Sequence, residues 1–354
     1  GASDRYTVTM RFPNGGIVIL LAVLDGSYAE SLRDKFEDFK MRYSVNFPSQ
    51  EEDDYRFEVF RKNLKFIEET NRRNLSYSLG VNAYAALTRD EVGDIRSCSD
   101  MAEDDNFLEV PATPPESVGD WPSELNWVTR GAVNTPRDQK KCGSCYAIAS
   151  LGALEGALQI RTGKLQKLSV QQVVDCSSTR PWGNFGCLGG RRLPTFKYVA
   201  DEGIVSDKDY PYKAKQGPCK PVTQDVKKQI LHKGDVAYDS TVRTKPLHPE
   251  EVMNELQHGP VAVGIFTNTP EWAHYKSGIL DSFTCRGDPG HVMLLVGYGV
   301  DHGKSYWLLQ DSEGPKRGEH GYVRVVRDPE NKPGPGFCNM FESRAFRPVL
   351  AHRI

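Results

Sequence analysis

The stretch Gln139–Ala147 reads QKKCGSCYA, and it decides how the rest of the chain is interpreted. Its second cysteine, Cys145, opens an apolar pattern that predicts a helix over residues 145–161, ended by Gly163. The first turn of a helix stabilises a thiolate through its free N–H groups and its dipole. An adjacent imidazole would make that thiolate a nucleophile near neutral pH. A lone cysteine would instead be buried or disulfide-bonded, so the sequence context must decide between these interpretations.

The context of Cys145 resembles the papain-like cysteine protease family. CGSCY matches the signature C-G-[SA]-C-[WY], which is followed by a histidine about 130–150 residues downstream. His291 follows Cys145 by 146 residues and begins the run HVMLLVGYG, a context that none of the other seven histidines has. A histidine that opens an apolar strand is otherwise most often a core or edge histidine. The resemblance implies that Cys145 is the nucleophile, His291 its base, and Gln139 an oxyanion-hole donor beside the Cys145 backbone N–H.

The third catalytic position departs from the family pattern. The family usually shows Y-W-x-x-x-N-S-W-G, whereas this chain reads YWLLQDSEG over residues 306–314. Asp311 thus replaces the Asn that orients the histidine, and Glu313 replaces the Trp that shields their hydrogen bond. A carboxylate orients the histidine of serine hydrolases, but it would also hold the proton on His291 more tightly. We expect reduced turnover or a shifted pH optimum, and a catalytically impaired homologue stays an alternative.

The other cysteines fit the same resemblance. Six cysteines allow 15 pairings, so the sequence alone does not give the connectivity. The family's three bridges imply the pairs Cys142–Cys187, Cys176–Cys219 and Cys285–Cys338, and they leave Cys98 over. No histidine partner stands at ligand spacing, so we expect no metal site and no cofactor.

A glycine-rich segment and the residues after it indicate substrate contacts. Residues 186–190 read GCLGG and match the family's G-C-x-G-G, in which Gly189 and Gly190 let the backbone pair with an extended peptide. A plain glycine-rich turn is the alternative. Two arginines follow where the family often has apolar residues, so we expect the main specificity pocket to accept acidic or polar side chains. By resemblance its lining comprises Arg191, Arg192, Gly264, Val292 and Ser343.

The N-terminal part carries a stripe of residues three or four positions apart, which predicts one helix over residues 52–71. An amphipathic core helix would explain the spacing alone, but the identities resemble the ERFNIN pattern of the family's inhibitory prodomain: Glu52, Arg56, Phe60, Asn63, Ile67 and Asn71. Residues 80–86 resemble its G-x-N-x-F-x-D element with Ala86 in place of the Asp, and residues 79–84 are predicted to be a strand or an extended segment. The resemblance implies that the segment after this element blocks the active-site cleft.

Two segments are predicted to be removed or cut. Residues 10–29 are typical of a signal peptide, with a basic start, an apolar run too short to span a bilayer, and a small-x-small cleavage site ending at Ala29. A buried strand is the alternative. Residues 98–122 are rich in Ser, Asp, Glu and Pro and are predicted to be an exposed linker with a processing site. Asn74 begins the one Asn-x-Ser/Thr sequon, a possible glycan site.

The pattern order predicts an α+β class, the papain-like two-lobed fold with an N-terminal helical prodomain. The prodomain covers residues 30–97 and the peptidase domain residues 123–354, in which helical patterns precede β-rich runs at residues 261–265, 292–296, 306–309 and 322–326. Residues 30–110 hold 12 Lys and Arg against 19 Asp and Glu, and residues 111–354 hold 31 against 26. Such opposite charges let two parts of a chain attract each other, although solvated surface charge explains them equally well. No run of interleaved arginines and aromatics favours nucleic-acid binding.

These patterns together predict a secreted or lysosome-type cysteine endopeptidase made as a zymogen. It would cleave peptide bonds through an acyl-enzyme on Cys145, with its own prodomain as inhibitor and protein or peptide substrates as partners. We expect a monomer without a membrane span, in the lysosome or vacuole or outside the cell. Two alternatives stay open: a catalytically impaired binding protein or decoy, and a transferase or ligase on the same scaffold.

Overall fold

The computed structural model describes residues 8–11, 17–20, 25–96, 121–178, 181–220, 225–237, 249–281, 284–328, 334, 336–341 and 345–351. Contacts along the chain divide it into two compact units, residues 1–67 with 81–87 and residues 68–80 with 88–354. Cys98 and most of the expected linker lie outside the described residues, so the predicted processing site is not tested. Within the described part, no helix has the length and apolar character that crossing a membrane requires.

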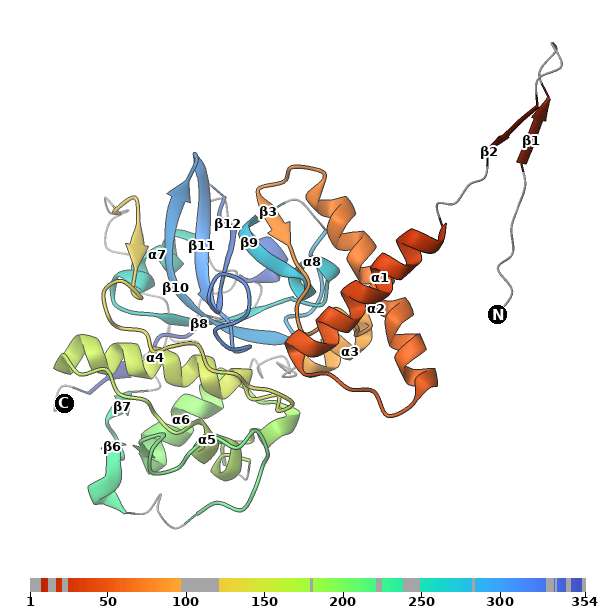
Figure 1. Cartoon of the computed structure of the whole chain (residues 1–354). Coiled ribbons are helices and arrows are strands. Elements are labelled where there is room, and N and C mark those ends of the chain that lie inside the picture. Colours follow the sequence, from red (N-terminus) through yellow and green to blue (C-terminus); the bar gives the residue numbers. More distant parts are fainter. Residues whose placement is uncertain are drawn as a thin grey trace. The chain divides into compact units, whose positions relative to one another are not determined.

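The first unit is built on two helices, coloured red to orange in Figure 1. Helix α1 spans Asp25–Tyr43 and begins inside the predicted signal peptide, and helix α2 spans Gln50–Asn71. Strands β1 (Val8–Arg11) and β2 (Ile17–Leu20) pair antiparallel before them. The fully buried ring of Phe36 contacts the rings of four other phenylalanines, which fill this unit's core: Phe39, Phe47, Phe57 and Phe60. The helix predicted over residues 52–71 is therefore confirmed.

The polar residues of the predicted stripe hold the returning chain by its backbone. Arg56 pairs with Glu52 at 2.6 Å, and its guanidinium donates to the Ala86 carbonyl oxygen at 3.2 Å. The Asn63 amide donates to two further carbonyl oxygens, those of Ala85 and Leu87, both at 3.0 Å. Because these bonds end on main-chain oxygens, they do not require an acidic side chain at position 86.

The strand predicted over residues 79–84 is wrong in its position. Strand β3 spans Tyr77–Leu79, and it forms because it pairs antiparallel with β9 (Tyr275–Leu280), nearly 200 residues later. Residues after it turn instead. The Asn82 side chain accepts a hydrogen bond from the Tyr84 N–H at 3.0 Å, a local bond that favours a turn over an extended chain.

A seven-stranded sheet forms one half of the second unit (Figure 1). Its strand order is β3-β9-β12-β11-β10-β4, and β8 also pairs with β10. The long strand β10 (His291–Asp301) is the centre, because β8 (Val261–Ile265), β11 (Lys304–Gln310) and β4 (Leu125–Asn126) all pair with it antiparallel. All four β-rich runs predicted from the sequence lie in strands of this sheet, the last of them as β12 (Tyr322–Val326).

Helices form the other half of this unit. Helix α4 spans Cys145–Thr162, which confirms the predicted helix, and Gly163 ends it in the left-handed conformation with φ of 73°. It approaches β10 closely, since a Cβ atom on Gly152 would lie 2.8 Å from a methyl of Leu294. The remaining helices are α3 (Arg89–Arg96), α5 (Val170–Cys176), α6 (Arg192–Glu202), α7 (Pro249–Gln257) and α8 (Pro270–Ala273).

Short elements complete the second unit. Two pairs of short strands are antiparallel: β5 (Ile204–Val205) with β6 (Gln229–Leu231), and β7 (Val236–Ala237) with β13 (Val349–Leu350). Three 3₁₀ turns are η1 (Gly186–Leu188), η3 (Val226–Lys228) and η5 (Phe337–Asn339). Helices α4 to α6 share an apolar core with residues of β8 and β10, so the helical half and the β half meet along the start of α4. The predicted α+β fold is confirmed.

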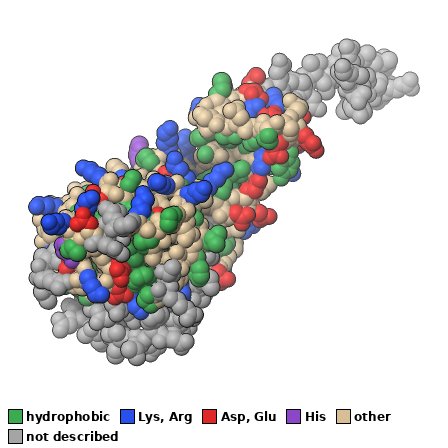
Figure 2. All heavy atoms as spheres, turned by 90° about the horizontal axis from the view of Figure 1, so that it is seen from below, with side chains coloured by type: hydrophobic (Ala, Val, Ile, Leu, Met, Phe, Trp, Pro, Cys, Tyr) green, Lys and Arg blue, Asp and Glu red, His purple; other side chains and the backbone are tan. Residues whose placement is uncertain are grey.

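Charged side chains of both signs lie on the face of the molecule that Figure 2 draws. Figure 2 shows Lys and Arg side chains interspersed with acidic and apolar ones on the face that it draws. Among the residues that the structure describes, no group of three or more His, Cys, Asp or Glu side chains could hold a metal ion.

Candidate active site

The expected nucleophile lies where the helical and β halves meet. Cys145 begins α4 and is fully buried, and its sulfur accepts a hydrogen bond from the Val292 N–H of β10 at 3.3 Å. Cys145 is itself disulfide-bonded. The other six described cysteines pair with one another. In this state the sulfur is positioned beside β10 but is not a free thiol.

The loop before Cys145 is fastened to the glycine-rich segment. The predicted bridge Cys142–Cys187 is present, and the Gly143 N–H donates to the Cys187 carbonyl oxygen at 2.9 Å. The Tyr146 hydroxyl donates to the Gly186 carbonyl oxygen at 3.1 Å. A Cβ atom on Gly190 would lie 2.7 Å from the Tyr146 ring, so that position admits no side chain. Tyr146 thus fills the place of the family's usual Trp.

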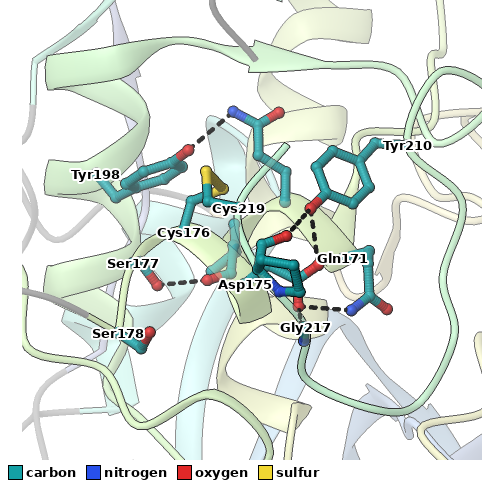
Figure 3. Close-up of a disulfide and its surroundings, with 12 residues drawn as sticks. Gln171, Asp175, Cys176, Ser177, Ser178, Tyr198, Tyr210, Gly217 and Cys219 are labelled. Carbon is teal, nitrogen blue, oxygen red and sulfur yellow. Dashed lines mark hydrogen bonds between the residues drawn. A yellow bond between two sulfur atoms is a disulfide. The ribbon is translucent and has the colours of Figure 1, made fainter. Parts of the chain in front are cut away.

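A second disulfide holds the loop that supports the other side of Cys145. Figure 3 shows the predicted bridge Cys176–Cys219 next to Asp175 at the end of α5. The Asp175 carboxylate accepts three hydrogen bonds, from the Tyr210 hydroxyl at 2.7 Å, the Gln171 amide at 2.9 Å and the Gly217 N–H at 2.7 Å (Figure 3). Burial, followed by the bond to Asp175, raises the pKa of Tyr210, so this hydroxyl stays a donor.

This loop delivers a tyrosine that the sequence did not point to. The Tyr212 hydroxyl donates to the Gln139 carbonyl oxygen at 2.9 Å and lies 2.6 Å from the Ser144 hydroxyl. Burial raises the pKa of Tyr212 to about 12, which keeps the hydroxyl protonated. Tyr212 therefore ties together the two ends of the loop between Gln139 and Cys145.

The expected base, His291, is the first residue of β10 and is fully buried. Its Nε2 lies 2.9 Å from a carboxylate oxygen of Asp311, and its Nδ1 lies 2.9 Å from the carbonyl oxygen of Arg96 in α3. Both neighbours are hydrogen-bond acceptors. Asp311 thus contacts the His291 ring from one side and the Arg96 backbone contacts it from the other.

Gln139 is brought to the same place by backbone pairing with the segment that carries Asp311. The Gln139 N–H donates to the Ser312 carbonyl oxygen at 2.7 Å, and the Gly314 N–H donates to the Arg137 carbonyl oxygen at 2.9 Å. The Gln139 side-chain oxygen accepts from the Ser312 hydroxyl. Its side-chain N–H group then points away from Ser312 and donates to the Ile95 carbonyl oxygen at 3.3 Å. A substrate carbonyl could use the same donor.

Two departures from the family pattern share a buried cation. Arg96 lies 3.3 Å from an Asp311 oxygen and 2.7 Å from a Glu313 oxygen, and only 2% of its surface is exposed. Burial would raise the pKa of Asp311, but Arg96 and the hydrogen bond with His291 outweigh it and hold that pKa below its ordinary value. Glu313 also pairs with buried Arg317 at 2.7 Å.

Neither arginine was predicted, although two buried carboxylates in an apolar setting require cationic partners. The spacing of Glu313 and Arg317, four residues apart, was a usable signal for one of these pairs. Arg96 lies 215 residues before Asp311, and nothing in the local sequence links them.

The described residues of the predicted specificity pocket lie on β8, on β10, at the start of α6 and just before it. Gly264 and Val292 are partners in the β8–β10 register. Arg192 begins α6, is fully buried, and places its guanidinium 4.9 Å from the centre of the Phe346 ring. The Arg191 N–H donates to the Asn184 side chain at 2.8 Å. Gly189 has φ of 125°, a conformation that favours glycine, and Ser343 lies outside the described residues.

Family models match the chain in two places. The model described as papain family cysteine protease matches residues 121–345, and the cathepsin propeptide inhibitor domain (I29) matches residues 36–92. The chain is 34% identical to cathepsin S of Mus musculus over 306 residues, 84% of this chain and 86% of the mouse protein. It is 33% identical to chymopapain of Carica papaya over 317 residues, 89% of this chain and 86% of the papaya protein.

Solved proenzymes share the fold. Digestive procathepsin L 3 of the Tenebrio molitor larval midgut superposes with a TM-score of 0.73 at 29% identity, covering 90% of this chain and 99% of that one. The proform of the ragweed pollen allergen Amb a 11 gives a TM-score of 0.78 at 28% identity, covering 92% and 87%. The third predicted bridge, Cys285–Cys338, is also present. The chain belongs to the papain family of cysteine proteases and is a cysteine peptidase made as a proenzyme with a cathepsin-type propeptide inhibitor domain.

Proposed function

We propose that the protein is a cysteine endopeptidase that cleaves peptide bonds through an acyl-enzyme on Cys145. The observation that carries this proposal is the contact of His291 with Asp311 beside the buried start of α4. An external thiol reduces the disulfide of Cys145 by thiol–disulfide exchange and is itself oxidised. The Cys145 thiolate released in this way attacks the substrate carbonyl carbon. The resulting oxyanion accepts hydrogen bonds from the Gln139 amide and the Cys145 N–H. His291 then gives its proton to the leaving amine, and water hydrolyses the thioester.

The described contacts also support inhibition by the end of α3. The Ile95 carbonyl oxygen uses the Gln139 donor, and the Arg96 carbonyl oxygen uses the His291 Nδ1. Both donors are those that the proposed reaction needs. Residues 30–97 therefore act as the inhibitory prodomain in this proposal, and cleavage within the linker of residues 98–122 releases them.

The first test is labelling of the acid-matured protein with an epoxide-type thiol probe, with and without a reductant. Reaction at Cys145 only after reduction, and none in Cys145→Ala, supports the proposal, because the thiol is disulfide-bonded in the structure. Absence of labelling in folded, processed and reduced protein would contradict it. Such a result would favour the binding-protein alternative, which the buried carboxylates at the Asn and Trp positions support.

Substrate choice follows from the two arginines after the glycine-rich segment. We propose that Arg192 at the start of α6 makes the main specificity pocket tolerant of acidic or polar side chains, because a buried guanidinium attracts a carboxylate. Peptide-library profiling of the wild type and Arg192→Leu tests this. A wild type that prefers only Leu or Phe at that subsite would rule the tolerance out.

The three disulfides of the described part and the cathepsin and papain relatives indicate the secretory pathway. We propose that residues 10–29 are a signal peptide and that the protein is delivered to the lysosome or vacuole or is released from the cell. Localisation of a C-terminally tagged protein with and without residues 10–29 tests both statements, since loss of secretion is expected only in the deletion.

A further inference from the structure

Four charged side chains form a buried cluster beside His291: Arg96, Asp311, Glu313 and Arg317. None of the four is exposed over more than a small fraction of its surface. Arg317 is fixed by the chain around it, because its guanidinium also donates to the carbonyl oxygens of Tyr275, at 2.8 Å, and Trp272. Arg96 is different, since it precedes the proposed processing linker and is removed with the prodomain.

Removal of Arg96 leaves two carboxylates with one arginine. Glu313 keeps Arg317, but the oxygen of Glu313 that faced Arg96 at 2.7 Å loses its cation. The pocket that Arg96 occupied also has an aromatic wall, since the Arg96 guanidinium lies 5.9 Å from the centre of the Trp272 ring. A carboxylate next to an aromatic face is a site that favours a guanidinium or an ammonium group.

The position of Arg96 relative to His291 shows which part of a substrate could reach this pocket. His291 uses Nε2 for Asp311, so Nδ1 is the nitrogen left to protonate the leaving amine. The Arg96 carbonyl oxygen lies 2.9 Å from that Nδ1, while the Arg96 side chain reaches Glu313. The leaving-amine position and Glu313 are therefore one arginine side chain apart.

A cavity of about 380 Å³ lies beside Arg96 in the proenzyme. Arg96 lines it, together with residues that stay with the peptidase domain, among them Phe266, Asn268 and Asp288. The peptidase-domain residues that line it include one carboxylate, Asp288, and no basic side chain.

We propose that Glu313 forms a cation-binding subsite that takes Arg or Lys as the first substrate residue after the scissile bond. This inference rests on the proposed peptidase function and names a substrate class for it. Arg should be the better ligand, because its planar fork can bridge two carboxylate oxygens and stack on the Trp272 ring. In the proenzyme, Arg96 fills this subsite in place of the substrate residue.

The test uses internally quenched peptides that differ only in the residue after the scissile bond, which is Arg, Lys, norleucine or Glu, with the cleavage position verified by mass spectrometry. In the matured wild type we expect kcat/KM for the Arg peptide to exceed that for norleucine by about tenfold, with Glu the poorest. Glu313→Gln should remove most of that preference. Glu255→Gln, which removes a carboxylate from the Arg347 ion pair, should retain it.

Two results would overturn the inference. One is a wild type that cleaves the norleucine peptide as well as the Arg peptide, a comparison that does not depend on any variant folding. The other is an Arg preference that survives in Glu313→Gln. If the matured protein cleaves none of the peptides, fluorescence anisotropy measures their dissociation constants instead. The expected order of affinity is then the same as the order expected for cleavage. Tighter binding of the Arg peptide would then sustain the subsite while the peptidase proposal fails.

Discussion

The two sides of the candidate active site are held by different forces. Residues 139–146, the cysteine side, are fixed by a disulfide and by neutral hydrogen bonds from Tyr146 and Tyr212. Residues 311–314, the acidic side, are fixed by carboxylates that are buried against arginines. A neutral hydrogen bond can be lost at modest cost, whereas removing one partner of a buried ion pair leaves a charge without compensation. Substitutions that remove a similar number of atoms should therefore destabilise the protein more on the acidic side than on the cysteine side.

The largest effect should come from Arg96→Gln in the proenzyme. It leaves Asp311 and Glu313 with one fewer buried cation, and breaking such a pair costs about 3–5 kcal/mol. Denaturant unfolding measures the loss. Arg89→Gln is the matched control on the same helix, because Arg89 is exposed and its side chain bonds to Asn268 alone among the described residues, so the stability of this variant should stay near that of the wild type. Equal losses in both variants would show that the buried pairs have no special weight.

The next effect concerns turnover. In the matured protein, Asp311→Ala should lower kcat/KM by about 100-fold, because His291 loses the acceptor at its Nε2. Asp311→Asn is the matched control, since its side-chain oxygen can still accept that hydrogen bond, and it should stay within about tenfold of the wild type. If the two variants have the same activity, the orienting role of Asp311 is wrong.

The pH dependence of proenzyme stability separates the two sides further. Although burial acts to raise it, the pKa of Asp311 lies below its ordinary value, so the unfolded chain binds this proton at a higher pH than the folded chain. The contribution of Asp311 to stability is thus complete above its unfolded pKa, about pH 4, and is lost as the pH falls through the folded pKa. We therefore expect that the titration of Asp311 leaves the melting temperature unchanged between pH 7 and 5 and lowers it below about pH 4.

Melting curves of the wild type and Asp311→Asn between pH 7 and 3 check this expectation. The melting temperature of the variant should fall less at acid pH than that of the wild type, because the variant lacks the part of the decrease that the titration of Asp311 causes. An identical decrease of the melting temperature at acid pH in both proteins would mean that other carboxylates cause it. The same reasoning implies that mild acid leaves the Arg96–Asp311 pair intact.

The smallest effect should come from the cysteine side. Tyr212→Phe removes a neutral hydroxyl that donates to the Gln139 carbonyl oxygen and contacts Ser144. We expect a loss of about 1 kcal/mol in the free energy of unfolding, read by denaturant unfolding, and unchanged substrate preference. A loss as large as that of Arg96→Gln would remove the distinction between the two sides.

Prediction from the sequence succeeded where the chain follows its family and where local patterns decide. The helix that starts at Cys145 and the three bridges of the described part were anticipated. The catalytic roles of Gln139, Cys145, His291 and Asp311 stay predictions, and the structure places His291 against Asp311 and Cys145 against Val292. The strand near residue 80 was misplaced because β3 depends on pairing with β9, while Asn82 turns the local chain. Arg96 was missed because its contacts span more than 200 residues.

The buried pair between Arg96 and Glu313 has a consequence for how proenzymes distinguish one another. A relative's prodomain with an apolar residue at the position of Arg96 would bury Glu313 and Asp311 against no cation of its own, and so should bind this peptidase poorly when supplied in trans. Conversely, this prodomain would carry an unneutralised arginine into any relative with Trp at the position of Glu313. On this reasoning the ion pair would couple this inhibitor to its own enzyme, and the two positions should change together in evolution.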